Sequence, residues 1–287
     1  MQLGYYHPEG AEYCGRLNCL KAEILYDILM TVSPRYARQI TTEELGEGLD
    51  GLLRKPQRRL PGILNGVDYN EWKTIDNPWL KNSFSLDNLQ GKDAEKRLLQ
   101  QELGLPQASN IPLFANISRL VDQKGSDILL AALEEMLAAN MQFVLLGTGS
   151  PALERAFQDL ARRYPGEVAV RIGYDHPLSH RIEAGCDFYL MPSRFEPCGL
   201  NQLYSLRYGT LPLVHAVGGL NDSIHEGPDG WGFRFDDETP KGLMAALDRA
   251  LALFSDGARW QDAMRRAMGR DHSWDRAAGQ YESLYKG

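Results

Sequence analysis

Several residues whose types could do chemistry lie directly after apolar segments of the chain. Arg119 and Lys124 follow an apolar run that ends near Ser118, and Gly125 comes next. Two cations in one loop before a helix suit a diphosphate, because Arg can bind two oxygens at once and Lys supplies a point charge. The alternative is a pair of solvated loop cations, since Lys and Arg are mostly exposed in proteins.

The stretch from Leu190 to Val214 combines an acid with the start of a helix. Glu196 lies in a polar loop after an apolar strand, and Gly199 leads into a helical run that ends at Gly209. A helix start preceded by glycine presents free backbone N–H groups to an anion. A carboxylate beside an anion site needs a different partner, such as sugar hydroxyls.

Other candidates give weaker signals. Gly147-Thr148-Gly149 is more often a tight turn than a phosphate loop. Tyr174 could stack on a nucleobase or simply be half-buried, and Gly218-Gly219 form a second glycine-rich turn between a strand and a helix. His215 and His225 lack metal-like spacing, so we predict structural roles for them.

Apolar strands alternate with amphipathic helices from Ile111 onward, which predicts a doubly wound α/β domain with a parallel sheet covered on both faces. Ligands of such domains bind at the carboxyl ends of the strands, where the candidates fall. The predicted strands are 111–118, 141–147, 167–173, 186–193 and 210–217, and the predicted helices are 92–103, 125–140, 151–164, 176–185, 239–254, 258–268 and 274–285.

Residues 1–60 differ from the remainder. We expect a helix over 17–29, a short strand over 30–33, and a helix over 34–40 with Ser33 as its N-cap. These elements are too few to close a sheet, so the region is interpreted as the tail of a domain whose first part is absent.

Composition narrows the class of protein. The chain has 287 residues and a net charge of −7, which gives no reason to expect nucleic acid or an anionic membrane as a partner. No apolar run reaches the roughly 18 residues that span a bilayer, and the N-terminus does not resemble a signal peptide. The four cysteines lack zinc spacing, and reduced thiols in the cytoplasm, or in a plastid stroma, are the default expectation.

Common catalytic motifs are missing from the sequence. No G-x-S-x-G supports a hydrolase nucleophile, and no G-x-G-x-x-G supports dinucleotide binding. No two carboxylates pair in an obvious way, which argues against ordinary glycoside hydrolysis.

Four stretches together closely resemble the family of bacterial glycogen synthases and plant starch synthases. They are SRLVDQKG, LLGTGSP, the long run from IGYDHPLSH through EPCGLNQLY to TLPLV, and VGGLNDSI. The resemblance implies a retaining glucosyltransferase with a GT-B fold, in which two Rossmann-like domains face each other across a cleft. This chain would supply the C-terminal, donor-binding part.

The resemblance also implies roles for individual residues. Arg119 and Lys124 match the pair that binds the donor diphosphate and stabilises departing ADP, and Glu196 matches the acid that contacts the donor glucose. The other implied positions bind substrate or nucleotide: Gly199, Leu200 and Asn201 at the phosphate, Tyr174 near adenine, Gly218 and Gly219 in a glycine-rich loop, and Asn65 in the cleft. No metal or other cofactor is implied, because the cations and the helix start supply positive charge.

The chain departs from the family pattern in several places. Tyr204 stands where many related retaining transferases carry a second Glu, which is usual for this branch. Val217 replaces a frequent Thr and removes a hydroxyl, and Asn201 replaces a Thr in a plant-like way. The family's Lys-x-Gly-Gly-Leu motif and a catalytic-site His are not found in this sequence.

The resemblance divides the chain into a remnant of an N-terminal, acceptor-side domain (1–66), a donor-binding domain (67–271) and a helix that crosses back (272–287). It implies ADP-glucose, an α-1,4-glucan acceptor and the missing N-terminal domain as partners.

Two hypotheses stay open. In one, the chain is the segment of a synthase that transfers glucose with retention to the non-reducing end of the glucan. In the other, it is a nucleotide-binding module that is inactive without its N-terminal half, and we expect this result for the isolated chain. A third, less favoured hypothesis is that the chain belongs to a transferase that uses another sugar nucleotide and a small acceptor.

Overall fold

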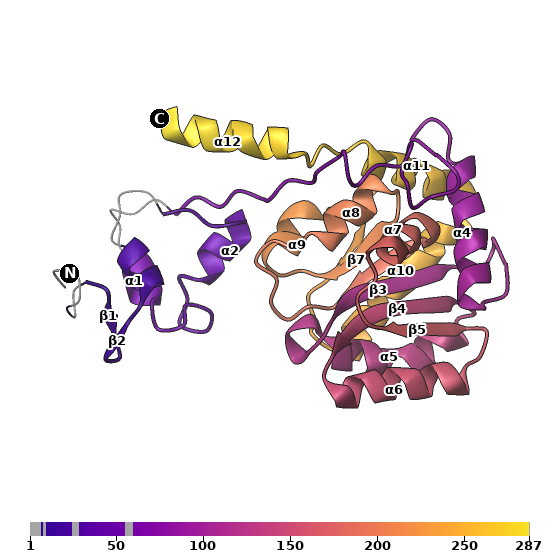
Figure 1. Ribbon diagram of the computed structural model, residues 1–287, viewed down its shortest axis with the longest axis horizontal. Coiled ribbons are helices and arrows are strands. Elements are labelled where there is room, and N and C mark those ends of the chain that lie inside the picture. Colours follow the sequence, from indigo (N-terminus) through magenta and orange to yellow (C-terminus); the bar gives the residue numbers. More distant parts are fainter. Residues whose placement is uncertain (1–6, 8–9, 25–28, 55–59, 287) are drawn as a thin grey trace.

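The computed structural model describes residues 7, 10–24, 29–54 and 60–286, and its centre is a six-stranded parallel sheet (Figure 1). The order across the sheet is β5-β4-β3-β6-β7-β8. The predicted α/β class is confirmed, with one further short strand, β8. The strands are β3 Leu113–Leu120, β4 Gln142–Gly149, β5 Val168–Ile172, β6 Phe188–Met191, β7 Leu211–His215 and β8 Phe233–Phe235.

Helices cover both faces of this sheet, so its central strands are apolar along nearly their whole length. Figure 1 shows α5 and α6 on one side and α7, α8 and α9 on the other. In addition, α10 packs on α5, α4 on α7, and α11 on α8. The bounds are α4 Gln90–Leu103, α5 Ser126–Ala138, α6 Pro151–Arg163, α7 His176–Gly185, α8 Asn201–Arg207, α9 Gly218–Ser223, α10 Pro240–Ser255 and α11 Gly257–Met268.

The direction of winding reverses between β3 and β6. From β3 the chain moves outward to β4 and β5, returns through α7 to β6, and continues in the other direction to β7 and β8. The connection after β3 leads to α5 on one side of the sheet and the connection after β6 leads to α8 on the other (Figure 1), which leaves a crevice at the carboxyl ends of these two neighbouring strands. In open α/β sheets this switch point is the usual place for a ligand.

The N-terminal region agrees with the prediction only in part. Its elements are β1 Glu12–Tyr13, β2 Arg16–Leu17, α1 Cys19–Glu23, α2 Pro34–Gln39 and α3 Asp50–Leu53. The predicted helix over 17–29 is wrong at its start, because Leu17 pairs in β2 and Asn18 caps α1 by accepting the Lys21 N–H. Residues 25–28 of that helix lie outside the described residues.

The predicted strand over 30–33 is also wrong, because only an isolated bridge between Thr31 and Gly62 forms there. The following helix is confirmed: the Ser33 hydroxyl accepts the Tyr36 N–H, and Pro34 is the first residue of α2. Proline suits that position, since the first helical N–H has no partner within the helix.

Two segments connect the N-terminal elements with the sheet domain. The Val67 N–H donates to the His272 carbonyl at 2.7 Å, just before α12 (Trp274–Lys286), which extends towards the N-terminal elements in Figure 1. Helix α2 packs on α9, and the Ser33 hydroxyl donates to the Pro197 carbonyl at 2.6 Å. The predicted division at 66 and 271 stays a prediction. In the described part of the chain no helix is long and apolar enough to cross a membrane.

Candidate functional site

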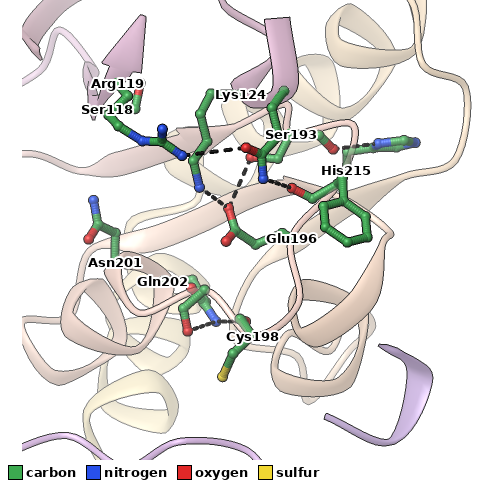
Figure 2. Close-up of polar contacts among 12 residues, drawn as sticks. Ser118, Arg119, Lys124, Ser193, Glu196, Cys198, Asn201, Gln202 and His215 are labelled. Atoms are coloured by element: carbon green, nitrogen blue, oxygen red, sulfur yellow. Dashed lines mark hydrogen bonds and ion pairs between the residues drawn. The ribbon is translucent and has the colours of Figure 1, made fainter. Parts of the chain in front are cut away.

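An ion pair between Lys124 and Glu196 lies at the switch point of the sheet. Lys124 ends a 3-10 turn, η1 (Asp122–Lys124), that follows β3, and Glu196 lies in the loop after β6. The Lys124 Nζ is 2.5 Å from the Glu196 Oε2, and the Ser193 hydroxyl donates to the same oxygen at 3.3 Å (Figure 2). Glu196 is 7% exposed, so its charge is largely withdrawn from water and depends on these partners.

Gly125 allows the two loops to approach each other. Its φ is +63°, and a Cβ at this position would lie 1.9 Å from the Pro192 carbonyl oxygen at the end of β6. Only glycine tolerates both the left-handed backbone and this close approach. The turn that carries Lys124 therefore packs directly against the strand end that leads to Glu196.

Arg194 ties the Glu196 loop to helix α5. Its guanidinium binds both oxygens of Asp127, at 2.6 and 2.7 Å, and its backbone N–H donates to the Gln123 carbonyl. The hydrogen bonds from Arg194 lower the pKa of Asp127. This bidentate contact restricts the orientation of the loop between β6 and α8.

A cavity of about 210 Å³ opens beside the ion pair. It brings together both predicted cations, the predicted acid and the predicted helix start. Three polar lining residues, Asn116, Ser118 and Ser193, were not predicted from the sequence, although the first two lie in the same strand as Arg119. The lining is Asn116, Ile117, Ser118, Arg119, Lys124, Met191, Ser193, Glu196, Gly199, Leu200 and Asn201.

A second cavity of about 200 Å³ adjoins the first, because both are lined by Ile117, Ser118 and Arg119. It extends to Tyr174, which is 88% exposed at its edge and thus not half-buried. The Gly147–Gly149 segment also lines this cavity, through its first two residues, Gly147 and Thr148. It is the last part of β4, paired with β3, and not a tight turn as its composition indicated.

Asn201 uses its side chain to hold helix α8 in place. Its amide donates to the Ile117 carbonyl at 2.8 Å and to the Tyr189 hydroxyl at 2.5 Å. Leu200 is the N-cap of α8 and makes no side-chain capping bond, and Gly199 before it has a φ of +72°. Any contact of this helix start with a ligand would therefore come from the backbone.

Gly218 and Gly219 lie behind the Glu196 loop. The Gly219 N–H donates to the Glu196 carbonyl at 3.0 Å, and the Gly218 N–H donates to the Gln39 side chain at 3.2 Å. A Cβ on Gly219 would meet the Cys198 carbonyl oxygen at 2.2 Å. These contacts support the loop that carries Glu196 and use both N–H groups within the protein.

Asn65 lies in a different cavity from Glu196. Its backbone N–H donates to the Cys198 sulfur at 3.4 Å, and it lines a space of about 260 Å³ together with Arg270 and His272. Burial raises the pKa of Cys198 to about 11. The thiol therefore stays protonated, which makes it a packing residue and a poor nucleophile.

The predicted structural histidines have partners suited to that role. His215 is buried, with Nδ1 2.8 Å from the Ser193 carbonyl oxygen and its ring stacked on Phe235. The His225 ring lies 5.3 Å from that of Trp231. Two other histidines, His176 and His180, come together one helical turn apart in α7. Their spacing of four positions was the available signal for this pair, and the sequence reasoning did not use it.

Family models and curated proteins match this chain. Residues 111–252 match the family model "Glycosyl transferases group 1", and residues 1–55 match "Starch synthase catalytic domain". The chain is 52% identical over 283 residues to a glycogen synthase from Anaeromyxobacter sp. (strain Fw109-5), and 47% identical over 290 residues to one from Thioalkalivibrio sulfidiphilus. These alignments cover 97% and 98% of this chain but 59% and 60% of the two relatives.

A solved structure shows the same relationship. The catalytic domain of starch synthase IV from Arabidopsis thaliana, bound to ADP and acarbose, superposes with a TM-score of 0.92 at 36% identity. The superposition covers 98% of this chain and 60% of that one. The sequence relatives, this structure and the placement of the predicted motifs at one switch point agree. The chain belongs to the glycogen synthase and starch synthase family of glycosyltransferases.

Proposed function

We propose that the cavity beside Lys124 and Glu196 binds ADP-glucose, and that the chain is part of an enzyme that transfers glucose to the non-reducing end of an α-1,4-glucan with retention. The observation that carries this proposal is the placement of a cation and an acid side by side at the switch point. A cation suits the diphosphate, whereas a carboxylate suits the hydroxyls of the sugar. A sugar diphosphate contains both groups within one molecule.

The donor would lie along the two adjoining cavities. The nucleobase would occupy the cavity edged by Tyr174, and the diphosphate would lie near Arg119, which lines both spaces. Lys124 and Arg119 would stabilise the negative charge that develops on the departing ADP. Fixed charges in a closed site act without reorganising during the reaction, so they are effective in this role.

The ion pair has a consequence for donor binding. Before the donor arrives, Glu196 neutralises Lys124 and holds it at 2.5 Å. A diphosphate carries more negative charge than one carboxylate, so it would compete for the ammonium group. The Glu196 carboxylate would then turn to the sugar hydroxyls, and the two ends of the pair would hold the two sides of the scissile bond.

Relatives support the choice of donor and acceptor. The matched starch synthase was solved with ADP, and the sequence relatives are glycogen synthases. On this basis we propose the glucan as acceptor, a further domain as the partner that binds it, and the cytoplasm as the compartment. The proposed domain limits are 1–66, 67–271 and 272–287.

ADP binding and ADP-glucose-dependent elongation of a glucan, both measured on this chain, test the proposal. Binding together with elongation would identify a complete transferase segment. Binding without elongation would support the module that needs its other domain. Absence of both would contradict the site assignment. Competition between ADP-glucose and UDP-glucose would show whether another sugar nucleotide is the donor.

A further inference from the structure

Three metal-ligating side chains meet at the start of helix α7, apart from the donor cavity. The Nε2 atoms of His176 and His180 are 3.3 Å apart, and the His176 Nε2 is 3.2 Å from the Glu71 Oε1. One ligand atom from each residue lies within 4.8 Å of the other two. Glu71 comes from the segment after Val67, more than one hundred positions away from α7.

Hydrogen bonds alone do not satisfy this arrangement. An imidazole nitrogen presents either one proton or one lone pair in the plane of its ring. The His176 Nε2 faces an imidazole nitrogen and a carboxylate oxygen at nearly the same distance. A proton there would serve one well-directed hydrogen bond, and a lone pair there would repel the carboxylate. A cation placed among the three atoms would satisfy all of them.

Two of the three separations between ligand atoms match a tetrahedral transition-metal ion, and the third is at most 4.8 Å. Ligands that lie about 2.0–2.2 Å from a tetrahedral centre are about 3.3–3.6 Å from one another. The two short separations, 3.3 and 3.2 Å, are close to this edge length. Two imidazoles and one carboxylate are also a ligand set typical of zinc, with water in the fourth position. We propose that Glu71, His176 and His180 bind Zn²⁺.

The surrounding residues hold the buried ligand rigidly. The His180 ring stacks on Trp72 with centroids 4.1 Å apart, and Trp72 in turn stacks on Tyr204 of α8 at 3.7 Å. The His180 Nδ1 is 2.8 Å from the Tyr208 hydroxyl, which receives an N–H from Asn77. A second contact on the far ring nitrogen is the usual device that orients a metal-bound histidine.

Exposure of the other two ligands leaves a route for the ion. The His176 side chain is 33% exposed and that of Glu71 is 48% exposed, whereas His180 is buried. A bound ion would join the Glu71 segment to α7 next to the Trp72 stack. None of the three ligands lines either donor cavity, so failure of one proposal does not affect the other.

The test is metal binding by the full chain with Cys14→Ser and Cys19→Ser, because these exposed thiols could also bind zinc. We expect one Zn²⁺ per chain by calorimetry, a higher thermal unfolding midpoint with Zn²⁺, and a visible spectrum of tetrahedral Co²⁺ after substitution. His176→Ala and Glu71→Gln, both at partly exposed positions, should each weaken Zn²⁺ binding by at least about tenfold. His225→Ala, outside the cluster, should leave it unchanged.

Two results would overturn the proposal. One is the absence of Zn²⁺ binding by a chain shown to be folded by circular dichroism. The other is binding or a Co²⁺ spectrum that His176→Ala and Glu71→Gln leave as it was, since the ion would then lie elsewhere.

Discussion

Lys124 and Glu196, 72 positions apart in the sequence, form a charged hydrogen bond of 2.5 Å at the point where the winding of the sheet reverses. The pair joins the loop after β3 to the loop after β6. The proposed function requires that this ion pair opens, so that Lys124 contacts the phosphate and Glu196 contacts the sugar. Two substitutions test the two ends separately.

Replacing Lys124 by Ala should weaken ADP binding by about 10- to 100-fold, because a hydrogen bond to a charged group is worth about 1.5–3 kcal/mol. Calorimetric titration with ADP measures the change. Lys241→Ala is the matched control, since this exposed lysine lies in α10. Equal affinities of the Lys124 variant and the unmodified chain would contradict the phosphate contact.

Replacing Glu196 by Gln should separate binding from transfer. The amide keeps the shape but not the charge, so Lys124 becomes available and ADP affinity should not fall. In the full-length transferase, kcat should drop by about 100-fold or more, as expected when a group acting on the transition state is removed. Glu135→Gln on the exposed surface of α5 is the control. A loss of ADP affinity as large as that of Lys124→Ala would instead indicate that the pair only shapes the cavity.

Replacing Gly219 by Ala should destabilise the fold by about 1–3 kcal/mol, the usual cost of forcing an extra carbon into a packed site. The new Cβ would lie 2.2 Å from the Cys198 carbonyl oxygen, and a backbone atom cannot move aside easily. Urea unfolding monitored by circular dichroism measures the effect. Gly279→Ala is the contrasting variant: it lies within α12 with nothing within 4 Å, so stability should stay equal or rise slightly. Equal midpoints for the two variants would refute the steric argument.

Glu183 should make stability depend on pH. Burial raises its pKa from 4.5 to about 8, and the Ser205 hydroxyl donates to its Oε2 at 2.7 Å. The folded protein keeps a proton that the unfolded chain releases above about pH 4.5. This contribution to stability is therefore full at low pH and is lost as the pH rises to about 8.

The neutral side chain of Glu183→Gln removes this dependence. The free energy of unfolding of the variant, relative to that of the unmodified chain, should therefore increase from about pH 5 to about pH 8. Taking the difference removes the opposite effect of His272, whose pKa burial lowers to about 4. Parallel stability curves for the two proteins would show that Glu183 titrates alike in both states.

Local patterns were sufficient to predict most of the sheet domain. The predicted strand over 111–118 became β3, and the predicted helix over 92–103 became α4, because both carry the spacing of buried residues that these structures need. The N-cap at Ser33 was also predicted correctly, since capping depends on a few neighbouring residues. By contrast, β8 has three residues, and so short a segment has no periodicity to recognise.

The sequence by itself indicated where the strands end, and so placed Arg119, Lys124 and Glu196 at one edge of a sheet. The predicted end at Ser118 was two residues too early, because Arg119 is still part of β3. Only the tertiary structure decided that β3 and β6 are neighbours, that Lys124 reaches Glu196, and that Glu71 lies beside α7. Strand order and loop contacts depend on how distant elements pack, and no local pattern contains that information. The contact by which the Asn201 side chain holds α8 to β3 likewise appears only in the tertiary structure, and the predicted phosphate contact of this helix start stays a prediction.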